Sequence, residues 1–272
     1  MKSLRYIFQG QSSRAEPSPA GSSPARSRLL ETGRLRPPSA ALPLAFLLCI
    51  SITTALSAQI TLANPSIPDR ESITYVRSSE QSTEMVYVEM RLIGPSEGNR
   101  PGRKPYYEYR MRSDSKEMIV KLTADTLETF YSEVWEKNTN STIHRSTEIV
   151  EQNKPVADGE LLLCDGNGLD VGLRGFPWDK HDEAILVFLN SSDKFQFKMK
   201  VEGRETLRIN DISYPCYKVQ LALGGFIGSL FPKSYFWYAV DSPHILVRAE
   251  AAGMMGDDSY EMELVSYSST GS

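Results

Sequence analysis

The chain has 272 residues, of which 30 are basic, 34 are acidic and 40% are hydrophobic, enough for one domain with a sizeable core. Its acidic balance, without clusters of lysine and arginine along the sequence, argues against nucleic acid or an anionic membrane surface as a partner.

Residues 1–58 differ in composition from the rest of the chain. Residues 1–39 are rich in Ser, Pro, Arg and Gly, and the apolar block 43–58 ends in small residues. This pattern is typical of a secretory signal peptide, cleaved after Ala58 or, as a second choice, after Ala63. The apolar block is shorter than the roughly 20 residues of a membrane-spanning helix. We therefore predict a cleaved leader and an exported protein, with an uncleaved membrane anchor as the alternative.

Removal of residues 1–58 would make the remaining protein distinctly acidic. The leader holds seven of the 30 basic and two of the 34 acidic residues, so 23 basic and 32 acidic residues remain, a net charge of −9. We predict that residues 59–79 form a flexible N-terminal segment. Residues 80–272 are predicted to form a single domain, because no repeat or shift in composition divides them.

Alternation of apolar and polar residues recurs along the predicted domain. It is irregular over the segments 84–93, 105–112, 116–123 and 127–136. It is regular over the segments 195–201, 217–223, 245–251 and 260–264. Alternation places apolar side chains on one face, which indicates antiparallel strands with one buried face. The unbroken apolar run 184–189 instead predicts a strand buried on both faces.

The segment 161–176 interrupts the alternation. It predicts a short strand followed by a short helical stretch, which Gly175 and Pro177 would end. The fold class that we predict is mainly β (α+β). It comprises a large curved antiparallel sheet, or half-barrel, with one or two short helices on the concave side.

The glycine-rich run 166–172 has two functional interpretations, and neither fits well. It follows a predicted strand, as in dinucleotide-binding turns, but no full helix follows it to face a pyrophosphate. A calcium loop would need oxygen ligands where Leu169 and Phe176 stand. A glycine-rich turn is the better interpretation, and we predict no cofactor.

Catalytic and metal-binding candidates are sparse. His144, His181 and His244 are too widely spaced for a metal-binding pair. His181 lies in the acidic run 179–183, which could hold a metal, although a solvated charged turn explains the same residues. Ser229 lacks the glycine-flanked elbow of hydrolases. We predict no metal, no catalytic residue and no enzymatic activity, with an uncharacterised hydrolase as a remote alternative.

The connection 221–237 is unusually apolar for a loop. Such a connection packs as core, lines a cavity or presents an apolar patch, because loops normally carry polar residues. If the concave face holds an apolar ligand, the walls and mouth of that groove are Phe195, Phe197, Met199, Tyr217, Val219, Leu221, Phe226, Phe231 and Trp237. The same side chains could simply fill the core.

Cys49 lies in the leader, whereas Cys164 and Cys216 remain in the predicted domain. Two cysteines in an exported protein could form a disulfide. Because both lie in apolar surroundings, two buried free thiols are almost as good an interpretation.

The C-terminal half shows a recognisable succession of segments, namely 195–205, 215–221, 236–249 and 260–267. With these segments and the motif Arg174-Gly-Phe-Pro-Trp178, the chain resembles a bacterial family of exported proteins, the domain of unknown function 3108 family. That family is distantly similar to LolA-like lipoprotein-carrier half-barrels. The resemblance implies a curved antiparallel sheet wrapped around helix, in the periplasm of a bacterium with an outer membrane, and it brings no catalytic residues.

Two functions remain after these exclusions. In the first, a periplasmic carrier shelters a lipid or a lipidated protein, since each buried methylene contributes roughly 0.8 kcal/mol. In the second, an envelope structural or interaction protein has a filled barrel and docks a partner on an edge strand or on the connection 226–231. A filled interior would argue against the carrier. Membrane contact is compatible with both functions, although we expect no transmembrane domain in the mature chain.

Overall fold

The computed structural model describes residues 60–95, 104–138, 141–148, 159–163, 166–188, 196–228, 231–252 and 259–271. All of them belong to one compact unit, Thr54–Ser272. The predicted leader over 1–58 lies outside the described residues. Within the described ranges, no helix is long and apolar enough to cross a membrane.

Strands dominate the described part of the chain. They are β1 (Arg70–Ser79), β2 (Thr83–Ile93), β3 (Tyr106–Arg112), β4 (Lys116–Thr123), β5 (Thr129–Asn138), β6 (Ser141–Glu148), β7 (Glu160–Leu163), β8 (Glu183–Phe188), β9 (Gln196–Ile209), β10 (Ile212–Leu223), β11 (Ser234–Ala239), β12 (Leu246–Ala251) and β13 (Tyr260–Thr270). The helical pieces are α1 (Leu169–Gly172), the 3-10 turn η1 (Leu173–Gly175) and α2 (Gly225–Gly228).

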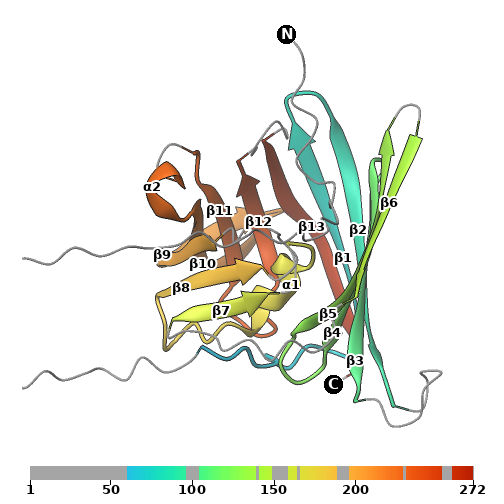
Figure 1. Cartoon of the computed structure of the whole chain (residues 1–272), viewed down its shortest axis with the longest axis horizontal. Coiled ribbons are helices and arrows are strands. Elements are labelled where there is room, and N and C mark those ends of the chain that lie inside the picture. Colours follow the sequence, from blue (N-terminus) through green and yellow to red (C-terminus); the bar gives the residue numbers. More distant parts are fainter. Residues whose placement is uncertain are drawn as a thin grey trace, which may run out of the picture. The chain divides into compact units, whose positions relative to one another are not determined.

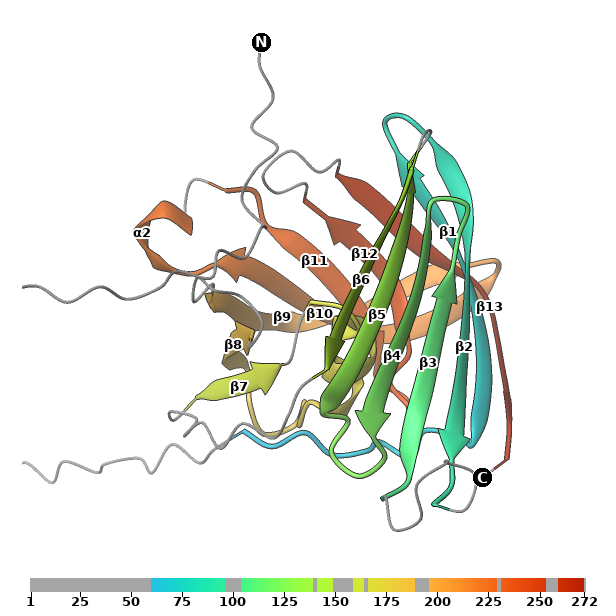
Figure 2. The same cartoon turned by 45° about the vertical axis from the view of Figure 1, so that its right-hand side comes forward.

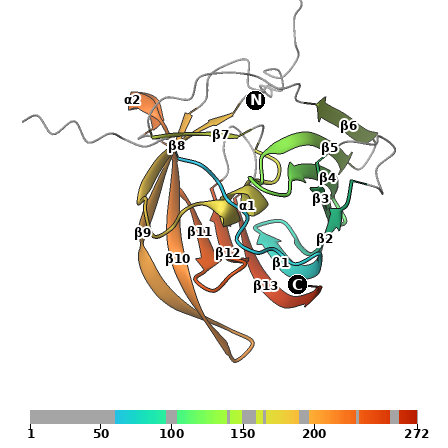
Figure 3. The same ribbon diagram turned by 90° about the horizontal axis from the view of Figure 1, so that it is seen from below.

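The described strands form one 13-stranded sheet in the order β6-β5-β4-β3-β2-β1-β13-β12-β11-β10-β9-β8-β7. Neighbours pair antiparallel except for β7 and β8, which pair parallel. Two runs of sequential strands, β1–β6 and β8–β13, meet where β1 pairs with β13. Figures 1 and 2 show the strong curvature of the sheet, and Figure 3 shows the sheet curving around α1. The predicted fold class is therefore confirmed.

The alternating segments form strands because one face of each packs on the core. In β10, Tyr217, Val219 and Leu221 are buried while Lys218 and Gln220 are partly exposed. In β9, Met199 is buried between the exposed Lys198 and Lys200. This is the pattern of an antiparallel sheet with one buried and one wet face.

The prediction that residues 59–79 form a flexible segment is wrong for residues 60–79, which the structure describes. Residues 70–79 form β1, which pairs with β2 on one side and with β13 on the other. Before it, Ile60, Leu62 and Ile67 are buried in the core. The N-terminal boundary of the folded domain therefore lies before residue 80, because this segment supplies both a central strand and core side chains.

The strand predicted over 184–189 is present as β8, but its predicted burial on both faces is wrong. Ala184 and Leu186 are buried, whereas Ile185 between them is 38% exposed. The strand therefore has one buried face, like its antiparallel neighbour β9. Because the outward-facing Ile185 is apolar, the sequence of this strand does not alternate between apolar and polar residues.

The helical stretch predicted within 161–176 is confirmed as α1 and η1, which lie inside the curve of the sheet (Figure 3). Val171, Leu173 and Phe176 are buried there. Gly175 allows the N-terminal segment to approach closely, because a Cβ at this position would lie 2.7 Å from the Ala63 carbonyl oxygen. The Ala63 amide donates a hydrogen bond of 3.0 Å to the Gly175 carbonyl.

Candidate functional site

Most of the predicted groove residues are ordinary core. Met199 and Val219 have no exposed surface, and Tyr217 and Leu221 are also buried. They belong to one continuous cluster that includes Val171, Leu173 and Phe176 from the helical stretch. The interior between sheet and helical stretch is therefore occupied by side chains of the chain itself.

Trp237 does not share a face with the other predicted groove residues. It lies directly opposite Lys218 across the β10–β11 pair, whereas Val219 lies opposite Phe236. Its indole Nε1 donates a hydrogen bond to the Glu205 carboxylate. The Lys218 ammonium lies 5.3 Å from the Trp237 ring centre. The placement of Trp237 in the concave wall is therefore wrong, because it packs on the opposite face under charged side chains.

Of the remaining groove candidates, the structure describes the side chains of Phe197 and Phe231. Phe197 is partly buried, and its ring meets that of Phe188 edge-on at 5.4 Å between centroids. Phe231 is also partly buried. Phe195 and the side chain of Phe226 lie outside the described residues. The structure thus leaves one partly buried aromatic end beside a filled interior.

A polar cluster sits within this apolar interior. Arg174 forms an ion pair with Glu71, and their side chains are 2% and 0% exposed. The Arg174 Nε also donates to the Pro243 carbonyl oxygen at 2.8 Å. The Tyr267 hydroxyl donates to Glu71 at 3.4 Å. The cluster therefore ties η1 to β1, to β13 and to the turn before β12.

Asp170 extends this polar cluster along α1. The Tyr109 hydroxyl donates a hydrogen bond of 2.6 Å to the Asp170 carboxylate. Burial raises the pKa of the Asp170 carboxyl, although the Tyr109 hydroxyl and the nearby Arg174 charge act in the opposite direction. Burial, and then the Asp170 charge, raises the pKa of Tyr238 well above its ordinary value. The Tyr238 hydroxyl has no hydrogen-bond partner among the described residues.

An aromatic group closes the interior on the side of β10 and β11. Trp178 stacks on Tyr217 with 5.1 Å between ring centroids and an interplanar angle of 12°. Arg204 lies 4.7 Å from the Tyr217 ring centre and forms an ion pair of 3.2 Å with Asp179. His181 contacts the Phe176 ring edge-on at 6.4 Å. In the described part of the chain, no group of three or more His, Cys, Asp and Glu side chains is placed to hold a metal.

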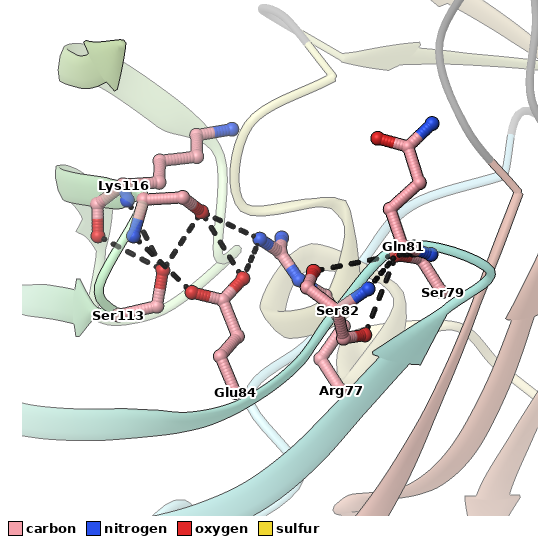
Figure 4. Close-up of polar contacts among 8 residues, drawn as sticks. Arg77, Ser79, Gln81, Ser82, Glu84, Ser113 and Lys116 are labelled. Carbon is pink, nitrogen blue, oxygen red and sulfur yellow. Dashed lines mark hydrogen bonds and ion pairs between the residues drawn. The ribbon is translucent and has the colours of Figure 1, made fainter. Parts of the chain in front are cut away.

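A second polar network joins the β1–β2 hairpin turn to the β3–β4 hairpin turn (Figure 4). The Glu84 carboxylate accepts hydrogen bonds from the Ser115 amide at 3.2 Å and hydroxyl at 3.0 Å, and it pairs with Arg77. Burial alone would raise the pKa of Glu84, but hydrogen bonds from Ser113 and Ser115 and the Arg77 charge outweigh it, so the pKa is lowered. Glu84 therefore links β1 and β2 to the turn between β3 and β4.

The Cys216 side chain is buried, and burial raises the pKa of its thiol to about 12. Its Sγ donates to the Tyr214 carbonyl oxygen at 3.3 Å. Cys164 lies outside the described residues, so a disulfide between the two stays a prediction.

Two pockets lie on the outer face of the sheet, and none of the predicted groove residues lines either one. A pocket of about 390 Å³ lies over β8 and β9 beside Ile185, Lys198 and Gly224. A second pocket of about 390 Å³ lies over β1, β2 and β3, and its charged outer residues are Arg70, Arg91, Arg110, Arg112, Glu89 and Glu108. Sequence reasoning missed this second site, because its arginines come from three separate strands.

Comparison with known proteins gives only distant structural likenesses. No protein-family model matches the chain, and no curated protein matches it. A β-barrel-like protein of domain of unknown function DUF1849 from Brucella abortus is 11% identical, with a TM-score of 0.38, over 78% of this chain and 99% of that chain. A DUF1329 family protein from Desulfovibrio piger is 8% identical, with a TM-score of 0.28, over 75% of this chain and 86% of that chain. The resemblance to the domain of unknown function 3108 family and to LolA-like carriers is not confirmed.

Proposed function

We propose that this protein is a non-enzymatic binding module of the periplasm that acts through the outer surface of its curved sheet. The observation that carries the proposal is the occupied interior. Met199, Val219 and Leu173 have no exposed surface, so an acyl chain would have to displace packed side chains. Export and a periplasmic location rest on the signal-peptide pattern over 1–58 and on the resemblance to exported proteins.

A second candidate function is the carriage of an apolar ligand at the partly buried aromatic end. The observation that favours it is the edge-on pair Phe188 and Phe197, which lies beside the partly buried Leu223. A ligand bound there would lie against the end of the sheet and leave the central core undisturbed.

Native mass spectrometry of mature protein purified without detergent from its own envelope separates the two functions. The binding module is expected to show its bare mass, or a mass increase that organic solvent does not remove. A lipid removed by solvent would favour the carrier. That lipid should then be absent from Phe197→Asp, provided that circular dichroism shows an intact fold.

The matched control for this experiment is Ile185→Asp. Ile185 lies opposite Lys198 on the outer face of the same pair of strands, whereas Phe197 lies opposite Leu186 on the inner face. If wild type and Ile185→Asp carry the lipid but Phe197→Asp does not, the protein is a carrier at the aromatic end, and the proposed binding module without an apolar ligand is overturned.

A further inference from the structure

Residues 60–67, which we call the N-terminal strap, precede β1 and pack into the fold. Figure 3 shows this segment, in blue, passing α1 on its way to β1. Ile60, Leu62 and Ile67 are buried in the core, whereas Thr61 is exposed. The strap therefore contributes core side chains although it forms no strand.

Hydrogen bonds tie the strap to two turns of the sheet. The Asn64 amide donates a hydrogen bond of 2.9 Å to the Asp125 carbonyl oxygen, and the Asn64 side chain donates one of 2.8 Å to the Ala124 carbonyl oxygen. The Ser242 hydroxyl donates to the Pro65 carbonyl oxygen. Together with the contact to η1 described above, these bonds fix the strap between the β4–β5 and β11–β12 turns.

The strap begins almost directly after the predicted leader. Only Gln59 separates the buried Ile60 from the apolar block that ends at Ala58. One residue spans at most about 3.6 Å, whereas the headgroup region on each side of a bilayer is roughly 5–7 Å thick. A docked strap and a leader still inserted in a membrane therefore compete for the same short stretch of chain.

The sequence offers two places for a cut before the strap. Leader peptidases cut after a small residue that is preceded, two positions earlier, by another small residue. Ala55 and Ser57 have this spacing, whereas Ala58 has Leu56 at the earlier position. Both cuts leave the whole strap on the mature protein.

A cut after Ala63 would instead divide the strap. It would remove Ile60 and Leu62, whose side chains are each 4% exposed, and leave their places in the core unfilled. A protease must also bind the chain on both sides of the bond, and buried or hydrogen-bonded backbone resists this. The amides of Ala63 and Asn64 are both hydrogen-bonded within the fold.

We propose that the leader is removed by hydrolysis after Ser57 or Ala58 while the strap is undocked, and that docking then closes this processing site. In this step, water adds its hydroxyl group to the carbonyl carbon and a proton to the nitrogen, which frees the leader and creates the new N-terminus. Ile60 is the second or third residue after the cut, so its burial removes the extended chain that a peptidase needs. The inference rests on the proposed function, since removal of a leader presupposes export.

N-terminal sequencing of the mature protein from its own envelope tests the position of the cut. The expected first residue is Ala58 or Gln59, and a protein that begins at Asn64 would overturn the proposal. A retained leader would overturn both the cut and the proposed export. A lipid removed by solvent from a protein that begins at Ala58 or Gln59 would contradict the proposed function alone.

The order of cutting and docking is tested on the folded, full-length chain in detergent with a purified leader peptidase. Leu62→Asp is expected to be cut about tenfold faster than wild type or more, because a buried charge holds the strap undocked. The matched control is Thr61→Asp, which changes the exposed neighbour and should be cut as slowly as wild type. Equal rates for wild type and Leu62→Asp, with the sheet intact by circular dichroism, would overturn the closing of the site.

Asn64→Ala tests the same order without a buried charge. It removes the hydrogen bond to the Ala124 carbonyl oxygen and the one of 2.8 Å that the Ile67 amide donates to the Asn64 side chain. The rate of cutting is expected to rise roughly fivefold, as the loss of a hydrogen bond shifts the strap toward the undocked state. If Leu62→Asp does not fold, an unchanged rate for Asn64→Ala overturns the proposal by itself.

Discussion

Arg174 and Glu71, which lie 103 residues apart in the sequence, form an ion pair inside the curved sheet. The pair joins the helical stretch to β1 at the centre of the sheet. Removing one partner of a buried pair leaves an uncompensated charge, which typically costs about 3–5 kcal/mol. The helical stretch is therefore held in place by charge as well as by apolar packing.

We predict that Arg174→Met lowers the free energy of unfolding by about 3–5 kcal/mol. The double variant Glu71→Met with Arg174→Met should recover much of that loss, because no unpaired charge remains. Urea unfolding measures both, with the exposed Arg208→Gln as control. A single variant as stable as wild type would show that the pair does not hold the helical stretch.

Asp170→Asn is predicted to become more stabilising as pH rises. Because the folded-state pKa of Asp170 is raised, the wild-type carboxyl contributes its full stability below its unfolded pKa and loses it as pH rises through the folded value. An amide cannot ionise, so the variant escapes this loss while its oxygen can still accept from Tyr109. Unfolding free energies at pH 3.5 and pH 7 check the trend, and a constant difference would contradict it.

For Glu84 we predict that the free energy of unfolding depends on pH in the opposite sense to that for Asp170, so that stability is lost at acid pH. The lowered pKa of Glu84 means that its stabilising effect is present above its ordinary value and is lost as pH falls through the folded value. Glu84→Gln should therefore lose less stability than wild type between pH 5 and pH 2.5, approximately the range over which carboxylates protonate. Glu80→Gln, in the exposed turn beside this network, should behave like wild type. Identical acid profiles for all three proteins would exclude this role of Glu84.

We predict that Met199→Ala and Ile185→Ala lower the free energy of unfolding by very different amounts. Met199→Ala removes a side chain with no exposed surface and should cost about 2–5 kcal/mol. Ile185→Ala, on the neighbouring strand but 38% exposed, should cost well under half as much. Chemical unfolding checks the contrast. A small loss for Met199→Ala would mean that this site is open space rather than packed core.

Cys216 is predicted to resist thiol reagents in the folded protein. Its thiol is buried, and its pKa of about 12 leaves almost no thiolate at pH 8. In a Cys164→Ser background, maleimide labelling at pH 8 should proceed only as fast as unfolding exposes the thiol. Rapid labelling of the native protein would contradict the burial of this residue.

Strands in which apolar and polar residues alternate could be predicted from the sequence, because one face of the sheet is exposed to solvent and the other is buried. Residues 196–201 of β9 and 217–223 of β10 are clear examples. The same reasoning missed β1, where the inward positions include Glu71. A charged residue breaks the expected alternation, and its partner Arg174 lies too far along the chain for a sequence pattern to reveal the pair.

The face of Trp237 and the arginine pocket could not be predicted for a related reason. Residues 235–238 are all aromatic, so alternation carries no information about which of them point inward. Only the register with Lys218 decides the face of Trp237. Likewise, Arg70 and Arg91 meet because β1 pairs with β2 in one particular register.

The pairing of β1 with β13 has a consequence for the order of folding. Each of the two runs of strands is built from neighbours in sequence, which pair early because little chain must be closed into a loop. The seam between them requires the strand that follows all other described strands in the chain. Until β13 has been synthesised, β1 and β12 each keep an unpaired edge that can recruit strands of other molecules. A truncation before Tyr260 would therefore produce aggregation rather than a smaller stable protein.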